Sequence, residues 1–199
     1  MELIYYIADT HLGHENVIEF DDRPFCSVEE MDRVIIENWR ARIRKDDEVY
    51  ILGDLVYRSR KTTSDYLEEL SGRKRLIVGN HNEKWIGDSS VRDRYFESVS
   101  YIKTVSDNSR KVVLCHYPLA EWSGMYRGAL HLYGHIHNHT DETFRIMKQR
   151  YGAFNAGCMI NNFMPCTLSE IIKNNESFWL TARDRQPDNH CEDCQGTGV

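Results

Sequence analysis

The first apolar run of the chain, Leu3–Ala8, is followed directly by the polar triplet Asp9-Thr10-His11. A short run with aromatic and β-branched members is typical of a buried strand. In an extended backbone the side chains at positions i and i+2 point to the same face, so Asp9 and His11 can reach one cation together. The pattern predicts a two-ligand metal site at the end of a strand, and other parts of the chain must supply the remaining ligands.

Two further predicted strands end in polar residues of the same kind. Glu48–Leu52 is followed by Gly53-Asp54, and Arg75–Val78 is followed by Gly79-Asn80-His81-Asn82. Helical patterns separate these strands, over residues 27–44 and 63–70. This alternation predicts parallel βαβ units, in which ligands gather at the carboxyl ends of the strands.

The second half of the chain is predicted to be richer in strands. We expect one hairpin from residues 98–104 and 111–115, and a second hairpin from residues 144–148 and 151–155. We also expect a single strand over residues 129–133 and a short helix over residues 167–174. The strand 111–115 ends in His116, and the strand 129–133 ends in Gly134-His135-Ile136-His137. These histidines extend the series of polar residues at strand ends.

Five predicted strands therefore end in oxygen or nitrogen donors, which are Asp9, His11, Asp54, Asn80, His116, His135 and His137. A mixture of imidazole and carboxylate suits first-row transition ions better than Ca²⁺ or Mg²⁺. Seven donors exceed the need of one ion but suit two ions that share a ligand, and a short carboxylate such as Asp54 can bridge ions roughly 3.5–4 Å apart. We expect two divalent ions chosen from Mn, Fe, Zn, Co and Ni, with Mn the first choice in an assay.

Taken in order, the motifs over about residues 3–160 resemble those of the calcineurin-like metallophosphoesterases, in particular small bacterial or phage-type members. The matching segments are Asp9-x-His11, Gly53-Asp54-x-x-x-Arg58, Gly79-Asn80-His81, His116 and Gly134-His135-x-His137. The resemblance implies an α/β fold, a four-layer α/β/β/α sandwich with two mixed β-sheets. It also implies hydrolysis of phosphomonoesters or phosphodiesters by a hydroxide that bridges two metal ions.

The resemblance further implies a role for each motif residue. One ion would be bound by Asp9, His11, Asp54 and His137, and the other by Asp54, Asn80, His116 and His135. His81 would hydrogen-bond the substrate or protonate the leaving oxygen, and Arg58 would orient the site carboxylates or bind a phosphate. The family usually has an acidic residue after Gly-Asn-His. Here Asn82 stands at that position, and an amide can hold a ring tautomer but cannot stabilise an imidazolium as a carboxylate does.

Four polar residues near the motifs are candidates for substrate binding, namely His14, Asn16, Arg23 and Asn82. His14 and Asn16 either contact a substrate phosphate or belong to a loop that only packs and caps. Arg23 either reaches the same cleft or forms a surface ion pair. We expect specificity to come from four loops, at residues 12–27, 56–63, 82–95 and 117–130.

Composition narrows the class of protein. A chain of 199 residues with 41% hydrophobic residues suits one domain, which we place at residues 1–182. The net charge of -6 provides no basic field for duplex nucleic acid. No apolar run approaches the roughly 20 residues that cross a bilayer, and Met1 leads directly into a strand without a signal-peptide pattern. We therefore expect a cytoplasmic protein, without a membrane partner, whose cysteines are free thiols.

The last part of the chain, residues 183–199, is predicted to be a polar tail with little order. It contains a CxxCxGxG segment that resembles one zinc knuckle of the DnaJ-type cysteine-rich domain. Cys191 and Cys194 either bind zinc together with a partner chain's copy, or have this spacing by chance.

These patterns predict a metal-dependent phosphoric ester hydrolase that acts on a small phosphate ester, with nucleotide-like compounds among the candidates. Two alternatives are left open. One is a catalytically weak binding scaffold that the metals stabilise, and the other is a nuclease that acts on single-stranded nucleic acid. The native metals, the choice between monoester and diester, and the oligomeric state are also left open.

Overall fold

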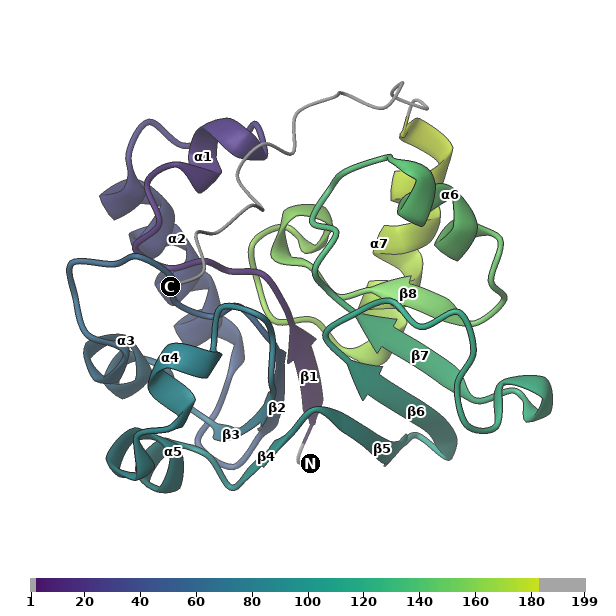
Figure 1. The fold of residues 1–199 in the computed structure, drawn as a ribbon, viewed down its shortest axis with the longest axis horizontal. Coiled ribbons are helices and arrows are strands. Elements are labelled where there is room, and N and C mark those ends of the chain that lie inside the picture. The colour runs from purple at the N-terminus through teal and green to yellow at the C-terminus, as the bar shows by residue number, and fades with distance from the viewer. Residues whose placement is uncertain (1–2, 183–199) are drawn as a thin grey trace, which may run out of the picture.

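The computed structural model describes residues 3–182 of the chain. Within this range the strands form two four-stranded sheets, and helices cover the outer face of each sheet (Figure 1). The fold is α/β, as the sequence predicts.

The first sheet has the strand order β1-β2-β3-β4, and all four strands are parallel. Its strands are β1 (Ile4–Ile7), β2 (Glu48–Leu52), β3 (Arg73–Ile77) and β4 (Ser98–Ser100). An isolated antiparallel bridge pairs Tyr6 of β1 with Cys166. The predicted βαβ units are confirmed, and the carboxyl ends of β1, β2 and β3 consequently lie at one edge of the sheet.

The second sheet has the order β5-β6-β7-β8 and is mixed. Its strands are β5 (Ile102–Asp107), β6 (Arg110–Cys115), β7 (Leu130–Tyr133) and β8 (Ala153–Asn155). β5 and β6 are antiparallel, whereas β6, β7 and β8 are parallel to one another. His116 follows the end of β6, and His135 and His137 follow the end of β7.

Successive side chains of a strand point to opposite faces of its sheet. This alternation gives three apolar layers, one between the two sheets and one on the outer face of each sheet. Tyr6 and Tyr50 of the first sheet pack with Leu114 and Leu132 of the second, which forms the core between the sheets. The neighbouring residues in β1 and β2, such as Ile7, face the opposite way and pack against α2 and α3. A third cluster lies on the outer face of the second sheet. The result is the expected four-layer α/β/β/α sandwich, but the expected two mixed sheets are one parallel sheet and one mixed sheet.

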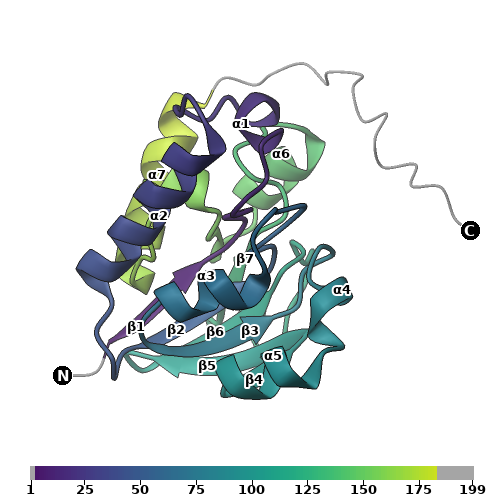
Figure 2. The same ribbon diagram turned by 90° about the vertical axis from the view of Figure 1, so that its left-hand side faces the viewer.

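The helices begin where the sequence offers capping residues. They are α1 (Val17–Phe20), α2 (Val28–Arg42), α3 (Thr63–Glu69), α4 (Glu83–Ile86), α5 (Ser89–Tyr95), α6 (Glu142–Lys148) and α7 (Leu168–Thr181), with 3-10 turns at Met125–Arg127 and Cys158–Asn161. Ser27 caps α2 by accepting from the backbone of Glu30, and Thr62 forms a capping box with Asp65 at α3. Figure 2 shows α3 and α5 in front of the first sheet.

Three sequence-based assignments are wrong. Residues 144–148 do not pair with 151–155 in a hairpin, because Asp141 caps α6 and its apolar residues Phe144 and Met147 are buried at helical spacing. The predicted strand 98–104 is divided between β4 and β5, which belong to different sheets. The helix that begins at the Thr167 capping box extends to Thr181 instead of ending near residue 174.

No helix within residues 3–182 combines the length and the apolar character that a membrane crossing needs. Cys26, Cys115, Cys158 and Cys166 are free thiols, and Cys115 and Cys158 are buried in the core. The tail with Cys191 and Cys194 lies outside the described residues.

Candidate metal centre

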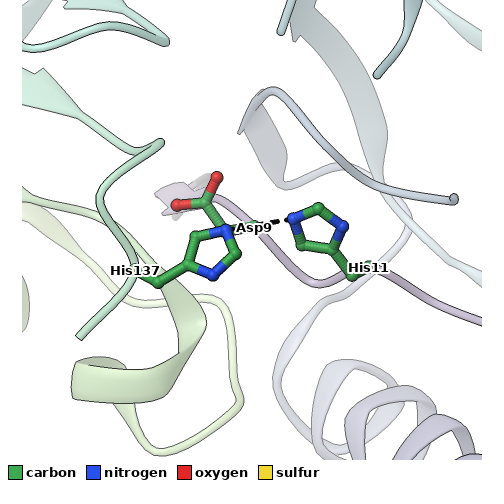
Figure 3. Close-up of side chains that lie close together, drawn as sticks. All are labelled: Asp9, His11 and His137. Carbon is green, nitrogen blue, oxygen red and sulfur yellow. Dashed lines mark hydrogen bonds between the residues drawn. The ribbon is translucent and has the colours of Figure 1, made fainter. Parts of the chain in front are cut away.

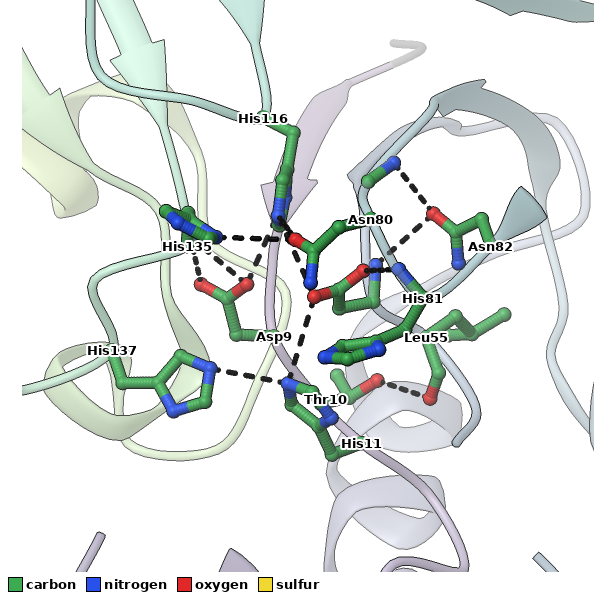
Figure 4. Close-up of polar contacts among 12 residues, drawn as sticks. Asp9, Thr10, His11, Leu55, Asn80, His81, Asn82, His116, His135 and His137 are labelled. Carbon is green, nitrogen blue, oxygen red and sulfur yellow. Dashed lines mark hydrogen bonds and ion pairs between the residues drawn. The ribbon is translucent and has the colours of Figure 1, made fainter. Parts of the chain in front are cut away.

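The residues that follow β1, β2, β3, β6 and β7 meet where the two sheets end side by side (Figure 4). The first sheet supplies Asp9, His11, Asp54 and Asn80, and the second supplies His116, His135 and His137. All seven predicted ligand residues are thereby gathered in one place, although they come from five separate strand ends.

Asp9, His11 and His137 form the first group of donors. Their ligand atoms lie within 4.8 Å of one another, and Figure 3 shows the three side chains pointing toward one another. The Nε2 atoms of His11 and His137 are 3.1 Å apart. Two nitrogens that each bind one cation at about 2.1 Å lie roughly 3.0–3.4 Å apart, so this spacing is that of two ligands of one ion.

Asn80, His116 and His135 form the second group. Oδ1 of Asn80 lies 2.9 Å from Nε2 of His116 and 3.1 Å from Nδ1 of His135. Nδ1 of His116 is 2.8 Å from the carbonyl oxygen of Leu52. In the neutral ring Nδ1–H therefore donates to Leu52, and Nε2 has a lone pair that faces the amide oxygen. Two acceptor atoms that face each other at this distance are suited to hold a cation between them.

Asp54 lies between the two groups. Its Oδ2 atom is 3.8 Å from Nε2 of His11 and 3.5 Å from Nε2 of His116. The other oxygen, Oδ1, accepts a hydrogen bond of 3.0 Å from the backbone N–H of His81. This bond orients the carboxylate so that one oxygen faces a histidine of each group. Asp9, Asp54 and His116 also lie together within 4.8 Å.

The local backbone at the site is unusual. Asp9, His11, Asp54, His135 and His137 all have positive φ angles, between 48° and 71°. Such angles are uncommon for residues with a side chain, and they cluster at functional sites. Close packing also requires Gly134, since a Cβ atom there would lie 2.7 Å from Oδ2 of Asp9. In return, the backbone N–H of His135 donates to both oxygens of Asp9, at 3.0 and 2.9 Å.

Burial shifts the pKa values of the carboxyl and imidazole groups at the site. Burial raises the pKa of the Asp9 carboxyl, although the neighbouring His137 and His116 oppose the change. Burial, together with the charges of His137 and Arg23, holds the pKa of His11 well below its ordinary value. Burial and His116 lower the pKa of His135 to about 4. Neutral imidazole is the form that binds a metal ion, so these donors fit divalent cations.

Asp21 is a functional residue that sequence reasoning missed. Its two carboxylate oxygens lie 2.8 and 2.9 Å from Nδ1 of His137, and Oδ1 lies 3.3 Å from Nε2 of His139. Burial opposes protonation of His137, but the hydrogen bond to Asp21 and the charge of Asp9 outweigh it and raise the pKa of His137. Asp21 is 116 positions from His137 in the sequence, in a loop without a motif, so no sequence signal pointed to it.

His81 and Arg58 lie beside the donor groups. The ring of His81 is 5.5 Å from that of His11, measured between centroids. The guanidinium of Arg58 lies over the ring of Tyr57, 5.2 Å from its centroid. Among the described residues no ion pair joins Arg58 to a site carboxylate. No contact of that kind therefore supports the expected role of Arg58 in orienting the carboxylates. Its role in phosphate binding stays a prediction.

Two of the four predicted substrate contacts are placed elsewhere. Arg23 is neither at the surface nor in a cleft: it is buried, forms an ion pair of 2.9 Å with Asp21, and donates to the carbonyl oxygens of Thr10 and Asp9. Asn82 is fully buried, and its Oδ1 accepts from the backbone N–H groups of Asp54 and Gly79. Both residues shape the loops that carry the ligands, and neither is open to a substrate.

The other two predicted contacts, His14 and Asn16, line a cavity of about 540 Å³ between α2 and α3, and none of the seven donor residues lines it. Arg58 lines the same cavity. Asn16 is exposed, whereas His14 is 7% exposed and neither of its ring nitrogens has a hydrogen-bond partner among the described residues. Burial and the charge of Arg58 lower the pKa of His14 to about 4. Their role as substrate contacts stays a prediction.

Fold and site together define an α/β sandwich protein with a candidate metal centre at the junction of its sheets. No family model matches the chain. It is 33% identical over 176 residues to Uncharacterized protein MJ1445 of Methanocaldococcus jannaschii, which is 87% of this chain and 91% of that protein. The chain belongs to the family of MJ1445. It is also 28% identical over 162 residues to Gene 66 protein of Mycobacterium phage D29, which is 69% of this chain and 80% of that protein.

A solved structure shows the same fold. A protein of unknown function from Aquifex aeolicus, AQ665, overlaps with a TM-score of 0.69 and 25% identity, over 87% of this chain and 99% of that one. Yfce, a phosphoesterase from E. coli, overlaps with a TM-score of only 0.37 and 17% identity, over 77% of each chain. An overlap that small carries no argument about activity, so function is argued from the site itself.

Proposed function

We propose that the chain is a metal-dependent phosphoesterase with two divalent first-row ions, and that it hydrolyses a phosphomonoester or phosphodiester bond of a small molecule, nucleotide-like compounds included. The observation that carries this proposal is the position of Asp54. One oxygen of its carboxylate faces His11 of one donor group and His116 of the other, at 3.8 and 3.5 Å. A bridging carboxylate between two sets of nitrogen and oxygen donors is the arrangement that a two-metal hydrolytic site needs.

The assignment of ligands follows the two donor groups. Asp9, His11 and His137 would hold one ion, Asn80, His116 and His135 would hold the other, and Asp54 would be shared. When bound, the two ions would supply Lewis acidity toward the phosphoryl oxygens and would lower the pKa of a water between them. Mn, Fe, Zn, Co and Ni suit this mixture of imidazole and carboxylate.

The chain's own residues supply the remaining chemistry. The backbone N–H of His81 holds Asp54, while the His81 side chain lies on the same turn and near His11. From there His81 donates a proton to the leaving oxygen. Asn82 stabilises the turn because its Oδ1 accepts from the backbone N–H groups of Asp54 and Gly79, at 3.1 and 2.8 Å. The bridging ligand and the proton donor are therefore fixed relative to each other.

Substrate binding is assigned to the cavity between α2 and α3. Arg58 and Asn16 line it together with His14, and a guanidinium and an amide are groups that bind phosphate oxygens. A volume of about 540 Å³ is within the range of pockets for small ligands. We assign the phosphate to the ions and the rest of the substrate to this cavity.

The test is hydrolysis of p-nitrophenyl phosphate, bis-p-nitrophenyl phosphate and a nucleotide panel, with each of the five metals. Asp54→Ala is expected to lose at least one bound ion, measured by elemental analysis of the dialysed protein. His81→Ala is expected to keep both ions and lose about 10²–10⁴-fold in kcat. Asp93→Ala, which changes an exposed carboxylate of α5, is the matched control.

Three outcomes would contradict the proposal or redirect it. Two bound ions without turnover of any substrate favour the metal-stabilised scaffold. Cleavage of single-stranded DNA or RNA, with salt-sensitive binding, favours the nuclease. Normal turnover by His81→Ala removes the assigned role of that side chain.

A further inference from the structure

The side chain of His81 lacks the polar support that His116 and His137 have. His116 is held by the carbonyl of Leu52 and His137 by the carboxylate of Asp21. Among the side chains and backbone groups that the structure describes, none hydrogen-bonds a ring nitrogen of His81. Asn82, the next residue, is turned away from the ring and holds the backbone instead. Some other contact must fix the orientation of this imidazole.

Tyr57 provides the closest ring contact of His81. The centroids of the two rings are 3.8 Å apart and their planes are inclined by 38°. Aromatic pairs usually have centroid distances of about 4.5–7 Å, so the phenol ring lies directly against the imidazole. A rotation of the His81 side chain toward Tyr57 is blocked on that face.

Tyr57 is itself held on several sides. Its backbone N–H donates to the carbonyl oxygen of Leu12 at 3.3 Å. The edge of its ring meets His14 at 4.9 Å and His11 at 6.1 Å, both nearly perpendicular. The guanidinium of Arg58 covers the ring at 5.2 Å. A ring with this many neighbours is a rigid surface for another side chain to pack on.

We propose that Tyr57 is a positioning residue for His81, and that its ring fixes the imidazole in the orientation from which the leaving oxygen is protonated. This inference rests on the proposed phosphoesterase function. A water oxygen forms the new bond to phosphorus and gives up a proton to solvent, while the bond from phosphorus to the leaving oxygen breaks. The leaving oxygen keeps that electron pair and takes a proton from a ring nitrogen of His81, and solvent returns a proton to the ring. The transfer needs the ring within hydrogen-bond reach, and Tyr57 limits the orientations that the ring can adopt.

Positioning of an acid has a consequence that a general structural role does not have. A good leaving group such as p-nitrophenolate departs without a proton, whereas a poor one such as phenolate needs it more. Loss of Tyr57 should therefore cost more rate on phenyl phosphate than on p-nitrophenyl phosphate. Diphenyl and bis-p-nitrophenyl phosphate replace this pair of substrates if the enzyme acts on diesters.

The experiment compares Tyr57→Leu with Tyr57→Phe, which keeps the ring. For Tyr57→Leu we expect kcat to fall about 10-fold on the phenyl ester and no more than about 2-fold on the p-nitrophenyl ester, with KM nearly unchanged. Tyr57→Phe should stay within about 2-fold of the wild type on both esters. In a His81→Ala background, Tyr57→Leu should cost nothing further. Tyr151→Leu, at a tyrosine that is 86% exposed, is the control for loss of a tyrosine elsewhere.

A measurement that is independent of turnover completes the test. The ring resonance of His81 is assigned by NMR from its absence in His81→Ala. We expect one sharp resonance in the wild type and in Tyr57→Phe. In Tyr57→Leu it should broaden or split, because the ring then occupies more than one rotamer.

The outcomes separate the two proposals. A wild type without turnover contradicts the phosphoesterase, and the NMR comparison still decides whether Tyr57 orders the ring. An equal loss on both esters, a further loss in the His81→Ala background, or a single sharp resonance in Tyr57→Leu would each overturn the positioning role.

Discussion

The carboxylate of Asp21 shows how a residue outside every motif controls a metal ligand. Asp21 accepts from Nδ1–H of His137, which leaves Nε2 of that ring as the free lone pair. Burial alone would raise the pKa of Asp21, but the hydrogen bonds from His137 and His139 and the charge of Arg23 lower it well below its ordinary value. Asp21 therefore remains ionised and can stabilise a cation that His137 binds.

Replacement of Asp21 tests this control. Asp21→Asn keeps the shape of the side chain and an acceptor for His137, but it removes the negative charge. We expect the affinity for Mn²⁺ to fall by about 10–100-fold, as losses of carboxylate partners of metal-bound histidines usually do. Isothermal titration calorimetry of the metal-free protein with Mn²⁺ measures this affinity. Asp93→Asn on α5 is the matched control, and a titration in which Asp21→Asn binds like the wild type would rule the role out.

At the scale of elements, sequence patterns predicted several features that depend on neighbours along the chain, although α6 with its local Asp141 cap was missed. The ends of β1 and β2, the Ser27 cap and the Thr167 capping box follow from spacing over a few residues, and so does the arrival of Asp9 and Asp54 at one sheet edge. The division of residues 98–104 between two sheets does not follow from local spacing, because it depends on which sheet each half can pair with. Burial of Arg23 and Asn82 also depends on distant contacts, and so their predicted exposure was wrong.

Strand β7 contains one histidine, His131, whose role is structural. His131 is fully buried, its Nδ1 lies 3.0 Å from the carbonyl oxygen of Val113 in β6, and its Nε2 accepts from the backbone N–H of Leu119 at 3.0 Å. Burial lowers the pKa of His131 to about 4, although its backbone hydrogen bonds oppose the change. Protonation of Nε2 would break the bond to Leu119, so the neutral ring ties β7, β6 and the following loop together.

His131 should make stability depend on pH. The folded pKa lies below the unfolded one, so the unfolded chain takes up the proton first as the pH falls. The contribution of His131 is therefore complete above about pH 6.5 and is lost toward pH 4, on the order of 3 kcal/mol in total. In urea unfolding with chelator present, the stability difference between the wild type and His131→Gln should shrink from pH 7.5 to pH 5. The other histidines titrate in both proteins and cancel. A difference that is independent of pH would contradict this account.

For the whole molecule, the candidate centre is also a connection between the two sheets. Asp9, His11, Asp54 and Asn80 follow strands of the first sheet, whereas His116, His135 and His137 follow strands of the second. Each proposed ion takes ligands from both sheets. Binding of the ions therefore stabilises the arrangement of one sheet against the other, and the unfolded chain cannot offer these ligands in the same geometry.

Metal binding should consequently raise the thermal stability of the entire protein. At a free metal concentration of about 100 times Kd, one site adds about 2.7 kcal/mol, which for a chain of this length raises Tm by roughly 5–10 °C. Differential scanning calorimetry in chelator and in Mn²⁺ measures the shift, with Ca²⁺ as the comparison, because the imidazole-rich donor set favours transition ions. Asp54→Ala, which loses the shared ligand, should show a much smaller rise, while Asp93→Ala should behave like the wild type. An equal rise in Ca²⁺, or an undiminished one in Asp54→Ala, would mean that the ions bind elsewhere.

A single cooperative transition in both chelator and Mn²⁺ is also expected, because the core between the sheets unites them even before metal binds.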